Sequence, residues 1–419
     1  MHPAPLPSGR GETDAAYSLL TAQAVRTRAH LMLDLGLADR LPHFRVAIDR
    51  LEAAAGLVLT TTRAAYPNLD VPLHARWRHF VVAGEDRWAA IARKARWPNP
   101  AARARAACDL AIVSVLLDAG AGPHWRYHDA ESGLTLGRSE GLALASLSMF
   151  ARGLFSADPG DPLRVDAAAL GELTERALAS GLQVSAENPL VGLEGRVALL
   201  RRLGEIVAGS PEVFARADSP RPGGLFDHLA GMAADQRLAA PTILSELLVH
   251  LGHLWPSRLV LGGMPLGDCW RHPALKTGDA TDGLVPLHKL SQWLAYSLVE
   301  PLAAGGLKIV DLDGLTGLAE YRNGGLFLDT GVLALREPQD ADRVHDVGSP
   351  LVIEWRALTV ALLDQLAARL RERLGMDATA LPLAKVLEGG TWAAGRAIAQ
   401  ARRADGAPPL RIASDGTVF

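Results

Sequence analysis

Apolar residues recur at three- and four-residue intervals along most of this chain. That spacing places them on one side of an α-helix, so it predicts a protein built mainly from helices. Thr21 and Ser349 are suited to cap the start of a helix, and Gly36 and Gly375 are suited to end one. The expected helices cover residues 22–35, 46–61, 86–95, 101–120, 137–155, 167–179, 192–208, 241–254, 286–303 and 350–374.

A small β element is expected among the helices. Short apolar runs at 307–310, 326–328 and 332–335 fit strands, and Asp329-Thr330-Gly331 suits a tight turn between the last two. We therefore expect a multi-helix globular fold of the mainly-α class, with a short β-hairpin near 326–335.

Turn-forming residues indicate how the chain divides. The first fifteen residues are rich in Pro and Gly, which predicts a disordered tail over 1–15. The sequence DPGDP at 158–162 favours a boundary between an N-terminal helical subdomain, 16–160, and a C-terminal helical subdomain, 161–419. The C-terminal subdomain would carry the functional site and the hairpin.

Composition restricts the classes of function. Apolar residues make up 49% of the 419 residues, which is enough for a substantial core. A net charge of −3 gives no general attraction to nucleic acid or to anionic membranes. Only two cysteines are present, Cys108 and Cys269, which favours a reducing compartment. No signal-like or membrane-spanning apolar run is visible, so the expected location is the cytoplasm.

Motifs for nucleotide cofactors are missing from the sequence. It contains no Walker motif and no G-x-G-x-x-G after an expected strand. No cofactor is therefore expected, and a site would have to be built from other polar side chains.

The densest mixture of charged and apolar residues lies at 311–335, with the sequence DLDGLTGLAEYRNGGLFLDTGVLAL. Glu320, Arg322 and Asn323 fall within four positions, and the two glycines that follow would let the backbone approach a ligand closely. A carboxylate in such a partly dry region can have a raised pKa or stabilise a developing cation. A plain surface pair between Glu320 and Arg322 is the alternative.

The helix expected just before this segment carries a polar stripe. Helical spacing places Lys289, Gln292, Tyr296 and Glu300 on one face, and one short connection joins the helix to the polar segment. We predict that this face contributes to substrate binding. A solvated helix face is the alternative.

Other polar and aromatic residues could complete a site. Glu354 and Arg356 repeat the Glu-x-Arg pattern inside an apolar helix, where a buried ion pair that holds the core is the alternative. Arg76 and the pair Trp270-Arg271 belong to aromatic-basic clusters, in which Arg can bind a phosphate and Trp can stack on a planar group. The alternative for these clusters is core or interface packing.

One set of residues has the form of a metal site. His250, His253, Cys269 and His272 have the spacing H-x2-H-x15-C-x2-H, which is compatible with zinc ligands. Only one thiolate is present, and Pro and Gly interrupt the interval. The main prediction therefore includes no metal, while the set keeps a metal-dependent hydrolase open as an alternative.

Long segments of the chain resemble a bacterial and fungal uracil-catabolism family, the one assigned to the fourth gene of the URC pathway. These segments include RWRHF at 76–80, NPLVGLEGR at 188–196, HKLSQWLAYSL at 288–298, DGLTGLAEYRNGGLF at 313–327, EWRALTVALLD at 354–364 and EGGTWAAGR at 388–396. The resemblance spans nearly the whole chain after the tail, and it implies a role in uracil degradation.

The last third of the chain also resembles the queuosine-salvage nucleoside hydrolases, through the order K-x-x-Q, LTG-x-x-EYR and E-x-R-A. This resemblance implies a helical core similar to that of base-excision DNA glycosylases and a catalytic carboxylate at Glu320. Ser297 stands where that family has a second carboxylate, so Glu300, one turn later, or Asp313 would supply the second acid.

The resulting hypothesis is a hydrolase that cleaves the N-glycosyl bond of a uracil-derived ribosyl compound, such as a ribosylurea or its phosphate. Glu320 would stabilise the oxocarbenium-like transition state, and Glu300 or Asp313 would transfer a proton. The substrate-binding residues would be Lys289, Gln292, Tyr296, Arg322, Asn323, Glu354, Arg356, Arg76, Trp270 and Arg271. The alternatives are a non-catalytic protein that binds a uracil-derived nucleotide and a metal-dependent amidohydrolase that attacks a ureido bond.

Overall fold

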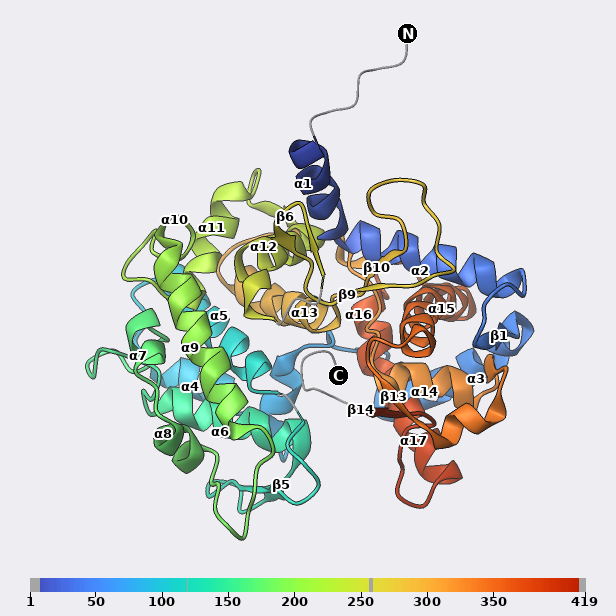
Figure 1. Ribbon diagram of the computed structural model, residues 1–419. Coiled ribbons are helices and arrows are strands. Elements are labelled where there is room, and N and C mark those ends of the chain that lie inside the picture. The colour runs from blue at the N-terminus through green and yellow to red at the C-terminus, as the bar shows by residue number, and fades with distance from the viewer. Residues whose placement is uncertain (1–7, 119, 256–258, 414–419) are drawn as a thin grey trace. The chain divides into compact units, whose positions relative to one another are not determined.

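The computed structural model describes residues 8–118, 120–255 and 259–413 (Figure 1). Helices account for 56% of the structure and strands for 9%, which confirms the predicted mainly-α fold. The chain forms two compact units. The first comprises Met1–His74, Trp255–Gln292 and Asp311–Phe419, and the second comprises Ala75–Leu254 and Trp293–Val310. The boundary predicted near residue 160 falls inside the second unit, which includes Ala75–Leu254. The chain does not divide once into an N-terminal and a C-terminal half, because it leaves the first unit and later returns to it.

The first unit contains helices from both ends of the chain. They are α1 (Ser8–Leu19), α2 (Ala22–Leu37), α3 (Leu51–Ala65), α14 (Tyr321–Asp329), α15 (Pro350–Leu374), α16 (Leu383–Val386) and α17 (Trp392–Arg402), with the start of α13 (Lys289–Ala304). Antiparallel ribbons pair β1 (Phe44–Val46) with β12 (Leu333–Leu335), β7 (Val260–Leu261) with β8 (Met264–Pro265), and β9 (Cys269–Arg271) with β10 (Leu284–Pro286). A parallel ribbon pairs β13 (Val344–Asp346) with β14 (Arg411–Ala413).

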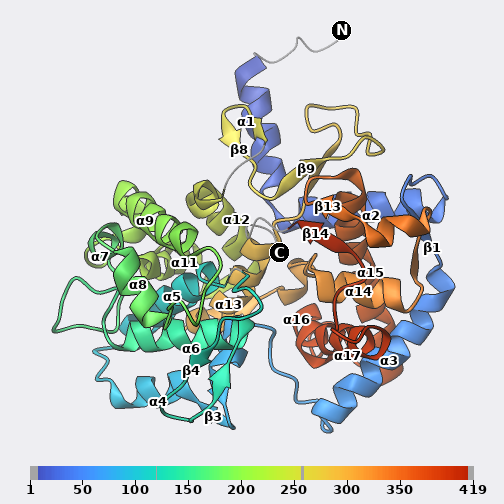
Figure 2. The ribbon, with the colours of Figure 1, turned by 60° about the horizontal axis from the view of Figure 1, so that its bottom comes forward.

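Helix α15 is the centre of the first unit. The Ser349 hydroxyl accepts a hydrogen bond from the N–H of Val352 at its start, and Gly375 ends it with φ of 63°. Nearly every residue of its first half is buried, and the helix packs against α2, α3 and α14. Figures 1 and 2 show α14 and α17 side by side next to it. The expected helix over 350–374 is confirmed, because continuous apolar spacing and both end signals agree.

The second unit is also helical. Its helices are α4 (Arg87–Lys94), α5 (Pro100–Leu116), α6 (Arg138–Ala151), α7 (Ala167–Gly171), α8 (Glu175–Gly181), α9 (Leu193–Gly209), α10 (Pro211–Phe214), α11 (Leu225–Met232) and α12 (Ala240–Leu251), with the remainder of α13. Its ribbons pair β2 (Val81–Val82) with β3 (Glu85–Asp86), β4 (Tyr127–His128) with β5 (Thr135–Leu136), and β6 (Arg237–Ala239) with β11 (Lys308–Val310).

Helix α5 forms the core of the second unit and carries a buried charge, Asp109. The Arg221 guanidinium lies 2.5 Å from this carboxylate, and the backbone N–H groups of Val165 and Gly223 donate to it at 3.0 and 2.5 Å. A fully buried carboxylate needs such partners, because an unpaired charge in the core would be strongly destabilising. Asp109 thus ties two separate segments, at Val165 and at Arg221–Gly223, to α5.

The predicted β-hairpin over 326–335 is wrong. Residues Tyr321–Asp329 form helix α14, and only Leu333–Leu335 forms a strand, which pairs with β1 instead of a neighbouring segment. The Glu320 side chain caps α14 by accepting hydrogen bonds from the N–H groups of Arg322 and Asn323. The apolar run at 326–328 resembles a strand in isolation, but this cap starts a helix five residues earlier.

Two further expectations about element boundaries are wrong. Helix α1 starts at Ser8, so a disordered tail does not extend over 8–15, while residues 1–7 lie outside the described part of the chain. Pro286 does not begin a helix, because it is the last residue of β10 and faces Cys269 of β9. Helix α13 begins three residues later, at Lys289.

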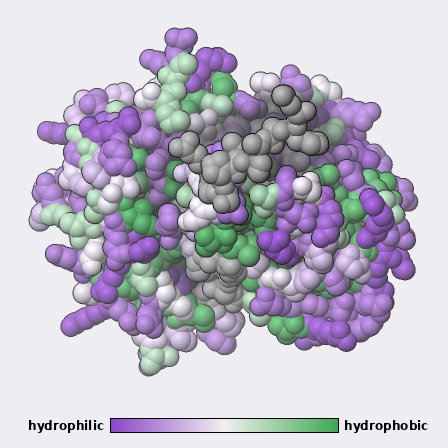
Figure 3. Space-filling view, turned by 45° about the horizontal axis from the view of Figure 1, so that its top comes forward, coloured by the Kyte–Doolittle hydropathy of each residue, from purple (hydrophilic) through white to green (hydrophobic). Residues whose placement is uncertain are grey.

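The surface in view is mostly hydrophilic, and its apolar areas are interrupted by charged and polar residues (Figure 3). Among the described residues, no helix is long and apolar enough to cross a membrane.

Candidate functional site

The first unit buries the carboxyl group of Glu320 at the start of α14. One oxygen accepts the N–H of Arg322 at 2.8 Å, and the other accepts the N–H of Asn323 at 2.5 Å. The residue is only 8% exposed. Burial raises the pKa of Glu320, while the Arg322 N–H, the charge of Lys289, the Asn323 N–H and the charge of His74 oppose the rise. Glu320 is therefore a buried acid that two backbone N–H groups hold in place, and the charge of Lys289 favours its ionised form.

Neighbouring polar groups hold the segment that leads to Glu320. The Gln292 amide donates to the Thr316 hydroxyl at 2.5 Å and accepts the Thr316 N–H at 3.3 Å. These bonds join the first turn of α13 to the segment just before Glu320. The Asn323 amide donates to the Leu318 carbonyl at 3.2 Å. Its Oδ1 atom is buried and has no hydrogen-bond partner among the described residues, so it can accept a bond from a ligand hydroxyl or a water.

A histidine–glutamate pair lies in the same unit, and it contains two residues that the sequence analysis did not select. His74 Nδ1 is 2.8 Å from Glu388 Oε2, and the side chains are 17% and 18% exposed. Glu388 can accept the Nδ1 proton of His74, which leaves Nε2 as the ring atom able to exchange a proton with a ligand. Glu388 lies on a single π-helical turn, Leu387–Thr391, and such turns are frequent at functional sites.

Asp268 and Arg356 form a bidentate ion pair next to this site. The Arg356 guanidinium donates to both Asp268 oxygens at 2.8 and 2.7 Å, and its Nε donates to the Ala319 carbonyl at 3.3 Å. Burial alone would raise the pKa of Asp268, but the Arg356 charge and hydrogen bonds lower it to about 2. Asp268 also accepts the Lys289 N–H at 3.0 Å. The pair therefore holds Lys289 and the residue before Glu320 in fixed positions.

Glu354 is fully buried and makes structural contacts. Its Oε1 accepts the backbone N–H groups of His43 and Phe44 at 3.2 and 2.8 Å, which fixes the chain that enters β1. Its Oε2 lies 3.4 Å from Nε2 of His272, and both side chains are completely buried. Glu354 and Arg356 do not form the buried ion pair expected as the alternative, because Arg356 pairs with Asp268 and Glu354 holds the chain that enters β1.

The predicted pair Trp270-Arg271 lies on β9. The Trp270 indole N–H donates to Asp268 at 2.6 Å, so this ring supports the ion pair with Arg356. Arg271 is exposed and donates to the Asp282 carbonyl at 2.7 Å.

Arg322, next to Glu320, donates to the Gly406 carbonyl at 2.9 Å, and its guanidinium lies 4.9 Å from the centre of the Tyr321 ring.

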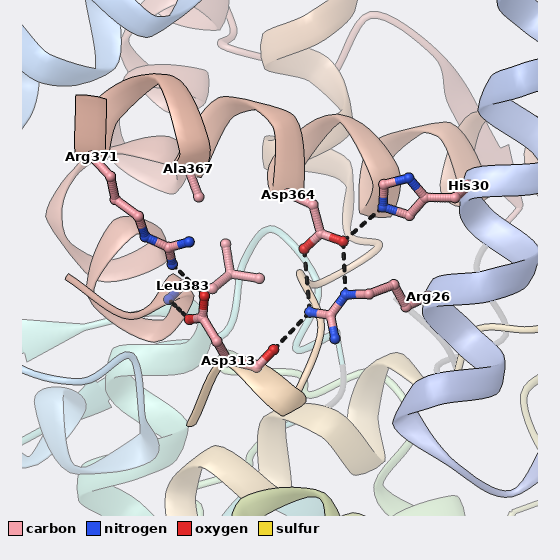
Figure 4. A pocket seen from close by; sticks show the side chains of 7 residues that line it. All are labelled: Arg26, His30, Asp313, Asp364, Ala367, Arg371 and Leu383. Atoms are coloured by element: carbon pink, nitrogen blue, oxygen red, sulfur yellow. Dashed lines mark hydrogen bonds and ion pairs between the residues drawn. The ribbon is translucent and has the colours of Figure 1, made fainter. Parts of the chain in front are cut away.

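Asp313 lies in a charged cavity of about 280 Å³ in the first unit. Figure 4 shows Arg371 pointing at Asp313, and Asp364 between Arg26 and His30. The distances are 2.5 Å for Arg371–Asp313 and 2.9 Å for both contacts of Asp364. The other Asp313 oxygen accepts the Leu383 N–H at 2.6 Å. Glu320 is not among the residues that line this cavity.

Three of the predicted residues belong to the second unit. Glu300 accepts hydrogen bonds from Arg78 at 2.7 Å on both oxygens, and Tyr296 is fully buried. Arg76 is fully buried too. Its backbone N–H donates to Ser297 at 3.0 Å, and its guanidinium donates to Ser114 at 2.7 Å and lies 3.2 Å from Asp118. Burial lowers the pKa of Arg76, and Asp118 opposes that effect. The contacts of Arg76 are those of a packed core residue.

Of the four residues with zinc-like spacing, His250 and His253 belong to the second unit, and Cys269 and His272 belong to the first. His272 faces Glu354, and burial raises the pKa of the Cys269 thiol, which disfavours the thiolate that a metal needs. His250 and His228 both contact Glu246. Neither His228 nor Glu246 is among the residues predicted from the sequence.

The fold and the site together define a mainly helical protein in which a capping carboxyl group is buried beside a lysine, a histidine–glutamate pair and a fixed ion pair. The chain belongs to the family described as "Protein of unknown function (DUF1688)", whose model matches residues 18–419.

Two named relatives are similar over nearly their full length. "Protein urg3" of Schizosaccharomyces pombe (strain 972 / ATCC 24843) is 39% identical over 417 residues, which cover 97% of this chain and 100% of that protein. "Uracil catabolism protein 4" of Lachancea kluyveri is 35% identical over 411 residues, which cover 90% of this chain and 92% of that protein. These matches confirm the family resemblance drawn from the sequence segments.

Proposed function

We propose that this protein is a hydrolase of uracil breakdown that cleaves the N-glycosyl bond of a uracil-derived ribosyl compound. The Lachancea kluyveri relative, "Uracil catabolism protein 4", supports the uracil-catabolism part of the proposal through its name. The observation that carries the chemical part is Glu320, a buried carboxyl group with a raised pKa beside Lys289 and His74. The substrate class would be a ribosylurea, its phosphate or a uridine-derived nucleoside or nucleotide.

Cleavage of a bond between ribose C1′ and nitrogen develops positive charge on the sugar. A carboxylate in a water-poor site stabilises such a charge and can accept a proton from an attacking water. Glu320 suits both tasks, because burial makes it a stronger base than a surface glutamate while two backbone N–H groups keep its position fixed. The open Oδ1 of Asn323 would accept a ribose hydroxyl.

His74 is the better partner for proton transfer to the leaving nitrogen. Glu300 and Asp313 each have both oxygens engaged, with Arg78 in one case and with Arg371 and the Leu383 N–H in the other. His74 is partly exposed, and Glu388 orients its ring in the manner of a catalytic histidine–carboxylate pair. Lys289 and Arg322 would bind sugar hydroxyls or a phosphate.

The test is a substrate panel with purified full-length protein. Ribosylurea, ribosylurea phosphate, uridine and uridine monophosphate are incubated separately, and release of urea or of uracil is followed over time. Turnover of at least one compound at a rate proportional to protein concentration is expected. A folded sample that converts none of the four would remove the N-glycosidase proposal.

A second proposal is a non-catalytic protein that binds a uracil-derived nucleotide. It is favoured by one observation: both oxygens of Glu320 already serve as a helix cap. Equilibrium binding of uridine monophosphate without any turnover, and with the same affinity in a Glu320→Gln variant, would support this second proposal over the first.

A further inference from the structure

The second unit contains a cluster of metal-binding side chains that the site around Glu320 does not use. His228 lies on α11, and Glu246 and His250 lie one turn apart on α12. Figure 1 shows these two helices as neighbours, with the short strand β6 between them in the chain. One ligand atom from each of the three residues lies within 4.8 Å of the others.

The geometry of the cluster is close to that of three ligands around one ion. His228 Nε2 is 2.6 Å and His250 Nε2 is 3.1 Å from the same oxygen, Oε2 of Glu246. Ligand atoms at about 2.0–2.1 Å from a tetrahedral zinc ion lie roughly 3.3 Å apart. The distance from His250 Nε2 to Glu246 Oε2 is already close to this value. The distance from His228 Nε2 to Glu246 Oε2 would have to increase by less than about 1 Å.

The surroundings of the cluster favour an ion. The three side chains are 13%, 16% and 23% exposed, so the ligands are partly withdrawn from water. The His228 and His250 rings are nearly perpendicular, at 81° with centroids 5.1 Å apart, and the His250 and Phe214 rings make a second edge-to-face contact. The fixed rings reduce the ordering that metal binding would otherwise require.

One residue of the cluster, His250, lies at the wall of a cavity. His250 also lines a cavity of about 330 Å³ together with His253, Arg202 and Glu205. Two histidines, one glutamate and an open position are the ligand arrangement of catalytic zinc sites, in which a water takes the fourth position. We propose that His228, Glu246 and His250 bind one divalent transition-metal ion, with zinc the best fit to nitrogen and oxygen ligands, and that its fourth position faces this cavity.

The site is separate from the zinc-like spacing noted in the sequence. It keeps His250 but replaces His253, Cys269 and His272 with His228 and Glu246, which lie 18 residues apart in the chain. No short sequence motif joins α11 to α12, so the pattern of residues alone does not reveal this cluster. The proposal does not depend on the glycosidase proposal, since none of the three residues belongs to that site.

The experiment measures zinc binding to the chelator-treated full-length protein by calorimetry and elemental analysis. One equivalent of zinc is expected for the wild type. His228→Gln and His250→Gln should weaken binding by more than about 100-fold, since loss of even an indirect supporting contact weakens metal sites by 10–100-fold. His253→Gln is the matched control, because it alters a histidine of the same cavity outside the cluster, and it should bind zinc like the wild type.

Cobalt(II) substitution gives a second readout that does not depend on activity. The cobalt protein should show the strong visible absorption of a four-coordinate site, and His228→Gln should lose it. Failure of the wild type to bind zinc, or binding by the His228→Gln and His250→Gln proteins that is as tight as that of the wild type, would overturn the proposal and leave a hydrogen-bonded cluster only. Circular dichroism of each variant establishes that it is folded, and Glu246→Gln provides an independent ligand change if one histidine variant is not.

Discussion

At the scale of single residues, the site depends on how each buried charge is paired. Glu320 and Asp268 are both buried carboxyl groups. Burial raises the pKa of Glu320, whereas at Asp268 the charge and hydrogen bonds of Arg356, with the Lys289 and Trp270 N–H groups, together outweigh burial. Their pKa values therefore move in opposite directions. A pair of carboxyl groups with separated pKa values is a common feature of sites that handle protons, and here Asp268 would be the fixed support and Glu320 the reacting group.

Asp268→Asn should destabilise the folded protein by about 3–5 kcal/mol at pH 7, because it leaves the buried Arg356 without its partner. Urea denaturation measures the change. Glu205→Gln, which breaks the exposed Arg202–Glu205 pair, is the control and should change the free energy of unfolding by no more than about 1 kcal/mol.

Asp268 should also make the stability of the folded protein depend on pH. The folded-state pKa of Asp268 lies below its ordinary value of 3.8, at about 2. The ionised group therefore stabilises the folded state above about pH 4, by about 2 kcal/mol, and this contribution is lost as the pH falls toward 2. Acid titration of the wild type should show that loss between pH 4 and 2. An equal loss in Asp268→Asn over the same interval would contradict the assignment.

His74→Gln should lower turnover by about 10²–10⁴-fold if the ring transfers the proton to the leaving nitrogen. Glu388→Gln should have a smaller effect, since it only weakens the orientation of the ring. Steady-state kinetics with the substrate found in the panel measures both. Unchanged turnover in His74→Gln would remove His74 from the mechanism.

At the scale of elements, glycines decide how α14 packs. A Cβ atom at Gly324 would lie 2.7 Å from the Trp355 ring of α15, and one at Gly395 of α17 would lie 2.2 Å from the Arg322 carbonyl. The two adjacent glycines were interpreted as a place where backbone approaches a ligand. At Gly324 the close neighbour is instead the indole ring, so this glycine allows α14 to lie against α15.

Gly324→Ala should therefore destabilise the protein by about 1–3 kcal/mol, through overpacking against Trp355. Gly195→Ala is the control, because this glycine lies in helix α9 and an added Cβ would meet nothing within 4 Å. The control should be neutral or stabilising by up to about 1 kcal/mol, since alanine is the better helix former. Thermal unfolding compares the two, and equal melting temperatures would show that α14 has room at this position.

Sequence patterns predicted some of these elements and missed others for physical reasons. The long helix over 350–374 was predictable because its apolar spacing, its Ser349 cap and Gly375 agree. Helix α14 was missed because it is nine residues long, contains two glycines and is started by a glutamate cap, so its apolar run resembles a strand. His74 and Glu388 were missed because they are 314 positions apart and meet only through folding.

At the scale of the whole molecule, the first unit is built from three separate segments of the chain. Helices α2 and α3 precede the second unit in sequence, and both pack on α15, which follows it. The fragment 255–419 therefore lacks the helices that cover α15. We expect it to show no cooperative unfolding transition and to bind a hydrophobic dye, whereas the full chain unfolds cooperatively. A cooperatively folded fragment would show that α15 is stable without α2 and α3.

The most direct test of the account is the turnover number of Glu320→Gln. The variant keeps one acceptor for the α14 cap, so it should fold with a loss of only about 1 kcal/mol in stability. With the substrate identified in the panel, we predict a decrease in kcat of at least about 100-fold, and no decrease for Glu337→Gln, an exposed glutamate of the same unit. A folded Glu320→Gln protein with wild-type kcat would contradict the central claim that this buried carboxyl group performs the chemistry.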